Sequence, residues 1–285
     1  MSTSSPTTAP GAGRGDDPRP PSARVVHVVV AAVGAVALVG AGASAAAGTV
    51  GGALRQDTVL TADAAGVTAV DVDVAAAEVR VVTGAPGTEV GLDVRGARGD
   101  WLLDRDGGTL VVSSPPRSSG WGLGWVGARG EGVATLTLPS DLARGVPDAE
   151  VDVAGGAVDV DGTFGTLRVG ATGGAVDLTG SVADLVVEVT GGGVDAALQD
   201  VATADVRTTA GSAVVSLDGT PPDAVAVDAT AGSVDLTLPP ATYDVRADAA
   251  AGGVDDRLRS SATSPRTVDV TLSAGSATLR EQGSR

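Results

Sequence analysis

One short phrase recurs along the second half of the chain, in forms such as Thr-Gly-Gly-x-Val-Asp and Ala-Gly-Ser-Val-Asp. Its glycines stand 18 to 23 residues apart, at Gly156, Gly174, Gly192, Gly211, Gly232, Gly252 and Gly275. A period near twenty is typical of proteins that stack one short unit on the next. The spacing therefore favours a stacked repeat over a globule built around a pocket.

Each repeat has the residue pattern of two short strands. In Val158-Asp-Val160 and Val176-Asp-Leu178 the apolar residues flank an aspartate, so they share one face of a strand and the aspartate takes the other. The glycines just before these segments suit a tight turn. A second alternating segment, such as Val187-Glu-Val189, follows in each repeat. Two strands and two turns in this length predict one coil of a β-solenoid.

The composition limits the core and the class of partner. Hydrophobic residues make up 43% of the chain but aromatic residues only 2%, which suits a thin core of small branched side chains. The absence of cysteine excludes disulfides, zinc–cysteine sites and thiol nucleophiles. A net charge of −16 argues against nucleic acid as a partner, because phosphate contacts need clustered cations.

An apolar segment near the N-terminus predicts export. Residues 25–48 carry one His and no charge, and as a helix these 24 residues would span roughly 36 Å, enough to cross a membrane. Arginines precede the segment, which favours a cytoplasmic N-terminus and an extracytoplasmic remainder. The alternative is a signal peptide cleaved near Ala43-Ser-Ala45, which would make the protein secreted.

The remaining boundaries follow from composition. Residues 1–24 predict a disordered cytoplasmic tail, residues 49–56 a tether, residues 57–139 an irregular β-rich part, and residues 140–285 the repeats. The predicted fold class is all-β: a single-pass N-terminal transmembrane helix followed by a repetitive β-solenoid with about 20 residues per coil.

The strands also resemble a known family. The run Val70-Asp-Val-Asp-Val-Ala-Ala-Ala-Glu-Val-Arg-Val81, the segment Ala134-Thr-Leu-Thr-Leu-Pro139 and the glycine phrases are similar to those of the DUF4097 family of adhesin-like, β-strand-repeat proteins. The likeness covers about residues 57–281 and includes the membrane segment common in actinobacterial members. It implies a membrane-tethered β-solenoid of the cell envelope, with no catalytic residues to transfer.

Aspartates that share one phase of the repeat form the first candidate site. Stacked in register they would line one face of the solenoid, either as a solvated surface that keeps the protein soluble or as a weak candidate site for cations. The repeat does not match the calcium-binding nonapeptide, because the position of its aspartate differs. These residues are Asp159, Asp177, Asp195, Asp235 and Asp255.

A glycine-rich loop forms the second candidate site. Trp121 and Trp125 lie among glycines and are flanked by Arg117 and Arg129. Tryptophan is favoured at membrane interfaces and at protein contacts, so these four residues are candidates for contact with a membrane or a partner. The alternative is that the loop packs its tryptophans onto the open end of the solenoid.

No catalytic or cofactor motif emerges from the sequence. His27 is the one histidine and lies in the apolar segment, so a hydrolase triad lacks its base, and no enzyme activity or cofactor is predicted. The predicted function is a non-enzymatic envelope protein that presents an adhesin-like solenoid for contact or envelope organisation. The alternative is a membrane-tethered sensor or regulatory partner in an envelope-stress response.

The predicted partners are the membrane itself and an unidentified envelope protein or glycan. Weak self-association is predicted as well, because a last coil ending at Leu279-Arg-Glu281 would leave an exposed strand edge.

Overall fold

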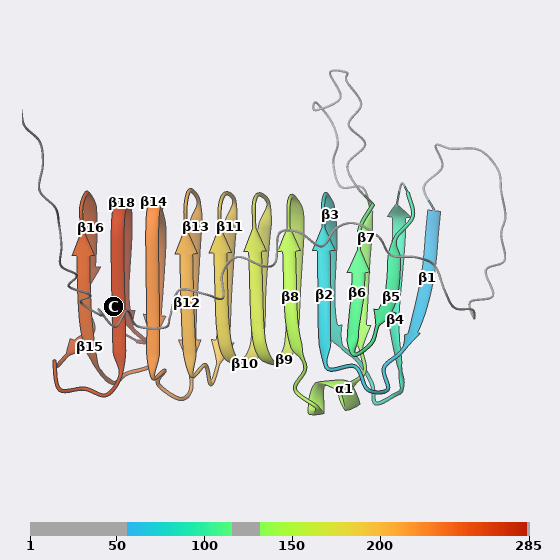
Figure 1. The fold of residues 1–285 in the computed structure, drawn as a ribbon, viewed down its shortest axis with the longest axis horizontal. Helices are drawn as coiled ribbons and strands as arrows, with labels where there is room; N and C mark the ends of the chain where they lie inside the picture. The colour runs from blue at the N-terminus through green and yellow to red at the C-terminus, as the bar shows by residue number, and fades with distance from the viewer. Residues whose placement is uncertain (1–55, 98, 116–131, 284–285) are drawn as a thin grey trace, which may run out of the picture. The chain divides into compact units, whose positions relative to one another are not determined.

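Alternating apolar and polar residues form strands along most of the chain. The computed structural model describes residues 56–97, 99–115 and 132–283. They form one sheet of 18 strands, with one short helix, α1 (Ser140–Arg144), before the repeats (Figure 1). The strands are β1 (Gln56–Asp63), β2 (Ala69–Val74), β3 (Ala77–Thr83), β4 (Glu89–Ala97), β5 (Leu102–Asp106), β6 (Thr109–Ser113), β7 (Val133–Leu138), β8 (Asp148–Val153), β9 (Gly156–Ala171), β10 (Ala175–Val189), β11 (Gly193–Gln199), β12 (Thr203–Thr208), β13 (Ser212–Asp218), β14 (Ala224–Leu238), β15 (Thr242–Ala249), β16 (Gly252–Asp256), β17 (Arg259–Ser260) and β18 (Thr267–Glu281).

The core is a narrow line of valine, leucine and alanine side chains. In the repeats Val158, Val160, Val176 and Leu178 are each about 99% buried, at 1% exposure, while Asp177 between the last two is exposed. This confirms the predicted inward and outward alternation. Because burial of one valine or leucine contributes about 1.5–3 kcal/mol, this continuous core is stabilised by many similar contributions of small side chains.

Glycines stack at the turns because no larger residue fits there. Gly174 has a φ of +91°, and a Cβ added to it would lie 2.4 Å from the carbonyl oxygen of Gly156. Gly192 meets the carbonyl oxygen of Gly174 in the same way, at 2.3 Å. Neighbouring turns therefore approach backbone to backbone, which is the physical reason that the glycine phrase recurs.

The middle repeats pair in parallel and in chain order. β9 lies beside β10 over almost its full length, with Asp159 opposite Asp177 and Val169 opposite Val187. The first half of β10 then pairs with β11, and its second half pairs with β12. One phrase is therefore placed directly beside the next.

At both ends the order of strands departs from the order of the chain. β18 lies between β14 on one side and β15 and β16 on the other (Figure 1). At the other end β2 lies between β6 and β8, and β3 lies between β7 and β9. Three pairs, β1–β4, β4–β7 and β5–β6, are antiparallel. The strands thus form a single mixed sheet, not a succession of 20-residue coils.

The predicted all-β class is therefore confirmed, but the predicted β-solenoid of successive 20-residue coils is wrong, because strands at both ends pair out of chain order. Within the described ranges no helix has the length and apolar character needed to cross a membrane. Residues 25–48, to which the helix was assigned, lie outside those ranges.

Matching residues explain the insertion of β18. Ala274-Gly-Ser276 of β18 lies opposite an identical triplet of β14, Ala231-Gly-Ser233, so the two strands have the same residues where they pair. β18 also buries Val268, Val270 and Leu272. Apart from Tyr243 and Asp244 at the start of β15, the residues of β15 and β16 are mostly exposed, which suits an outer position because less apolar surface is lost from the core there.

The exposed edge also differs from the one predicted. Leu279 of β18 is paired with β14 on one side and with β16 on the other. Glu281 is paired with Leu238 of β14, and its carboxylate accepts a hydrogen bond from the backbone N–H of Arg259. The outer strands at this end are β15 and β16. Self-association remains a prediction, and the strand edge on which it was based is covered.

Candidate functional site

The five predicted aspartates do not form an unbroken row. Asp159, Asp177 and Asp195 lie directly opposite one another on β9, β10 and β11. Val214 then separates Asp195 from Asp235, and Thr278 separates Asp235 from Asp255. Only three of the five aspartates are therefore neighbours.

Arginines neutralise much of this row. Arg80 lies 3.1 Å from Asp159, and Arg280 lies 3.1 Å from Asp235. Arg257 lies 2.6 Å from Asp255, and its hydrogen bonds hold the pKa of that carboxyl below the usual range. No group of three or more acidic or histidine side chains in the described segments is placed to hold a metal ion. Cation binding by the row remains a prediction.

The second predicted site is the glycine-rich loop with its two tryptophans. Trp121, Trp125, Arg117 and Arg129 belong to residues 116–131, which lie outside the described residues. Their contact with a membrane or a partner remains a prediction.

A second acidic surface, not predicted from the sequence, lies on the other outward face. Asp73 of β2 is opposite Asp152 of β8, Asp152 is opposite Gly170 of β9, and Gly170 is opposite Glu188 of β10. The missing side chain at Gly170 leaves room between the carboxylates, and a Cβ added there would lie 2.2 Å from Oδ1 of Asp152. We call this surface, with its cavity of about 360 Å³, the acidic notch.

Burial and mutual repulsion raise pKa values around the notch. The pKa of Asp152 rises to about 6, first because its carboxyl is partly desolvated and then because Glu150, Asp71, Asp73 and Glu188 repel its charge. The pKa of Asp71 is raised for similar reasons, with Glu150 and Asp73 as its charged neighbours. The notch therefore holds excess negative charge, which attracts cationic groups and retains a proton at mildly acidic pH.

The notch was missed because Asp73 is distant in the chain from Asp152, although Asp152, Gly170 and Glu188 share one phase of the repeat. Asp71-Val-Asp73 and Glu150-Val-Asp152 are both strands with two outward acids, and the sequence shows nothing that would pair them. Gly170 was the available signal, since glycine inside a strand often marks a close approach.

Comparisons with known proteins give a distant likeness only. No family model and no curated protein matches the sequence. The crystal structure of a "putative adhesin" from Bacteroides fragilis shows a TM-score of 0.42 and 13% identity, covering 80% of this chain and 97% of that one. A "putative cell adhesion protein" from Clostridium sporogenes shows a TM-score of 0.36 and 12% identity, covering 80% and 100%. A "putative adhesin" from Parabacteroides distasonis shows a TM-score of 0.40 and 10% identity, covering 80% and 98%.

Proposed function

We propose that the chain is a non-enzymatic contact protein of the cell envelope, which presents the outward faces of its sheet to another surface molecule. The observation that carries this proposal is a row of outward side chains in register across eleven strands. In order the row contains Val59, Asp93, Thr135, Arg80, Asp159, Asp177, Asp195, Val214, Asp235, Thr278 and Asp255. Such a row offers one extended surface built from many equivalent positions.

The interior supports a role for the outer faces. Inward residues such as Leu178, Leu198 and Leu236 are 0–1% exposed and pack against one another, so the space between the strands is filled by apolar side chains. Chemistry is therefore confined to the outside, where short polar and charged side chains predominate. Repeat proteins use extended surfaces of this kind for binding.

Export is the second part of the proposal. The apolar run 25–39, followed by the small residues Ala43-Ser-Ala45, favours passage of the remaining chain across the membrane. The resemblance of the strand phrases to the adhesin-like DUF4097 family agrees with an envelope location.

Attachment of intact cells tests the proposal. The full-length chain with a C-terminal tag is produced in its host, and attachment to envelope glycans and to neighbouring cells is counted. Asp177→Arg with Asp195→Arg alters one outward face, and Asp73→Arg with Glu150→Arg alters the other. Circular dichroism of each purified variant shows whether the strands are retained.

We expect external protease to remove the tag and at least one face variant to attach several-fold less. Unchanged attachment by both variants would contradict a contact function. A tag that stays protected after the cell wall is removed would contradict export. An altered envelope-stress response with unchanged attachment would favour the sensor alternative instead.

A further inference from the structure

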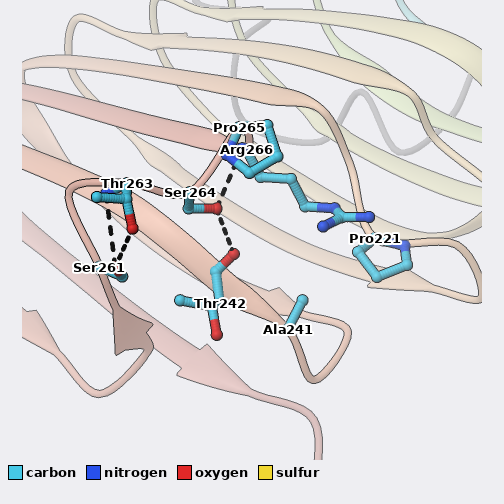
Figure 2. Close-up of a pocket in the computed structure, with 8 residues that line it drawn as sticks. All are labelled: Pro221, Ala241, Thr242, Ser261, Thr263, Ser264, Pro265 and Arg266. Carbon is cyan, nitrogen blue, oxygen red and sulfur yellow. Dashed lines mark hydrogen bonds between the residues drawn. The ribbon is translucent and has the colours of Figure 1, made fainter.

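A second cavity lies far from the acidic notch along the sheet, among the connections around β15 and β18. Its volume is about 430 Å³. Pro221 comes from the connection between β13 and β14, Thr242 begins β15, and Ser261, Thr263 and Arg266 come from the loop before β18. Figure 2 shows the Arg266 side chain extending from its loop toward Pro221.

Arg266 is unusual among the arginines of this chain. Of the eleven described arginines, eight have a carboxylate within 4.0 Å: Arg80, Arg95, Arg144, Arg207, Arg246, Arg257, Arg259 and Arg280. The half-buried Arg266 has no carboxylate partner among the described residues, and its Nε is buried without a hydrogen-bond acceptor. In a chain with 35 acidic residues, a guanidinium without a carboxylate in a cavity is a ready site for an anion.

Hydrogen bonds hold the loop that carries Arg266. The Ser264 hydroxyl donates to the carbonyl oxygen of Thr242 at 2.7 Å and accepts from the backbone N–H of Arg266 at 3.2 Å. These two bonds, drawn in Figure 2, tie the base of Arg266 to β15. The guanidinium is therefore presented from a fixed backbone, which lowers the entropy lost on binding.

Hydroxyl-bearing residues line part of the cavity, beside the apolar Pro221, Ala241 and Pro265. Oγ of Ser261 and Oγ1 of Thr263 lie 3.0 Å apart, and the exposed Thr242 adds a third hydroxyl. Hydroxyls both donate and accept hydrogen bonds, so they complement the hydroxyls of a sugar. A single planar guanidinium matches a single planar carboxylate through two parallel hydrogen bonds.

We propose that this cavity binds a carboxylated sugar, a uronic-acid unit of an acidic polysaccharide. The guanidinium of Arg266 holds the carboxylate, and the hydroxyls of Thr242, Ser261 and Thr263 contact the sugar ring's substituents. One positive charge suits a monoanion better than a phosphate dianion in a chain with a net charge of −16. This assignment deepens the proposed contact function and depends on it for its biological setting.

Calorimetry on the purified full-length chain tests the site. The probe is trigalacturonate, compared with neutral maltotriose, acetate and inorganic phosphate. Arg266→Gln removes the guanidinium, and Arg168→Gln is the matched control, because Arg168 is exposed on a sheet face and has no carboxylate partner among the described residues. We expect trigalacturonate to bind at least about tenfold more weakly to Arg266→Gln, and equally to the wild type and Arg168→Gln.

Arg266→Lys covers the case in which the glutamine variant does not fold. Lysine keeps the charge but lacks the planar fork, so we expect an intermediate affinity. Equal binding by wild type and the folded variants would overturn the proposal, as would no binding by the wild type. Equal affinity for maltotriose or acetate, or tighter binding of phosphate, would also overturn it. If the chain binds trigalacturonate but cells do not attach, the contact function is refuted and the site is not. If cells attach but the chain does not bind trigalacturonate, the site is refuted and the contact function is not.

Discussion

Gly275 lies in register beside Gly232, the phrase glycine of a strand two repeats earlier in the chain. The glycine of the intervening repeat, Gly252, lies on the other side of Gly275. The C-terminal strand β18 is therefore inserted into the sheet, and β15 and β16 lie outside it. The ends of the sheet thus depend on how well strands match, not on their order in the chain.

Replacement of a turn glycine should be costly. We expect Gly174→Ala to lower the free energy of unfolding by more than about 2 kcal/mol, because the residue has a φ of +91° and its new Cβ would meet the carbonyl oxygen of Gly156. Gly253→Ala is the control, since nothing lies within 4 Å of a Cβ built there. Denaturant titration compares the two. A similar midpoint for both variants would show that the glycine column is not required.

Asp152 should make stability depend on pH. Its pKa is raised to about 6 in the folded state, so the folded chain binds this proton more tightly than the unfolded chain. The group therefore costs stability as the pH rises from about 4 through 6. We expect Asp152→Asn to be more stable than the wild type by on the order of 1 kcal/mol above pH 7, allowing for solvent screening, and equal to it near pH 4.

Unfolding midpoints measured across this pH range check the effect. Asp177→Asn removes one charge from the opposite outward face and serves as the control. A constant difference between Asp152→Asn and the wild type at all pH values would exclude this titration.

Replacing an aspartate of the row should change stability differently depending on whether an arginine pairs with it. Asp177 lies between Asp159 and Asp195, so we expect Asp177→Thr to raise stability by about 0.2–1 kcal/mol through relief of like charge. Asp235→Thr loses its pairing with Arg280 and should instead leave stability unchanged or lower it by up to about 1 kcal/mol. Thermal unfolding of both variants measures this. The opposite order of stabilities would contradict the electrostatics described here.

Tyr243 offers a probe of the core near the second cavity. It is fully buried, its hydroxyl donates to the carbonyl oxygen of Pro239 at 2.9 Å, and burial raises its pKa to about 12. It is the one tyrosine of the chain, so tyrosinate absorbance reports on it alone. We expect titration near pH 12 in the folded state, with stability lost as the pH rises from about 10 through 12. Titration near pH 10 before unfolding would show that Tyr243 is accessible to solvent.

Local patterns predicted the strands, the buried valines and the glycine turns, because those depend on neighbouring residues. The position of β18 could not be predicted in this way, since it depends on how well Ala274-Gly-Ser276 matches one of several similar phrases. The short helix α1 was not predicted either, because its five residues are too few to show a helical period.

The candidate sites likewise include one that could be predicted from the local sequence and others that depend on how distant segments pack. Asp159, Asp177 and Asp195 share one phase of the repeat, so their alignment follows from sequence. The acidic notch instead joins Asp73 to Asp152 through strands that are distant in the chain. Arg266 carried no signal, because its lack of a carboxylate partner becomes visible only when the surrounding loops are placed.

Disulfide crosslinking tests the inserted strand most directly, because the native chain has no cysteine. Ser233 lies opposite Ser276, while Gly253 lies beyond Ser276, two strands from Ser233. Adjacent strands lie about 4.8 Å apart, within disulfide reach, whereas strands two apart lie near 10 Å and beyond it. We expect mild oxidation to crosslink Ser233→Cys with Ser276→Cys rapidly, and Ser233→Cys with Gly253→Cys hardly at all. Rapid crosslinking of the second pair and not the first would mean that the repeats stack in chain order, and would contradict the strand order described here.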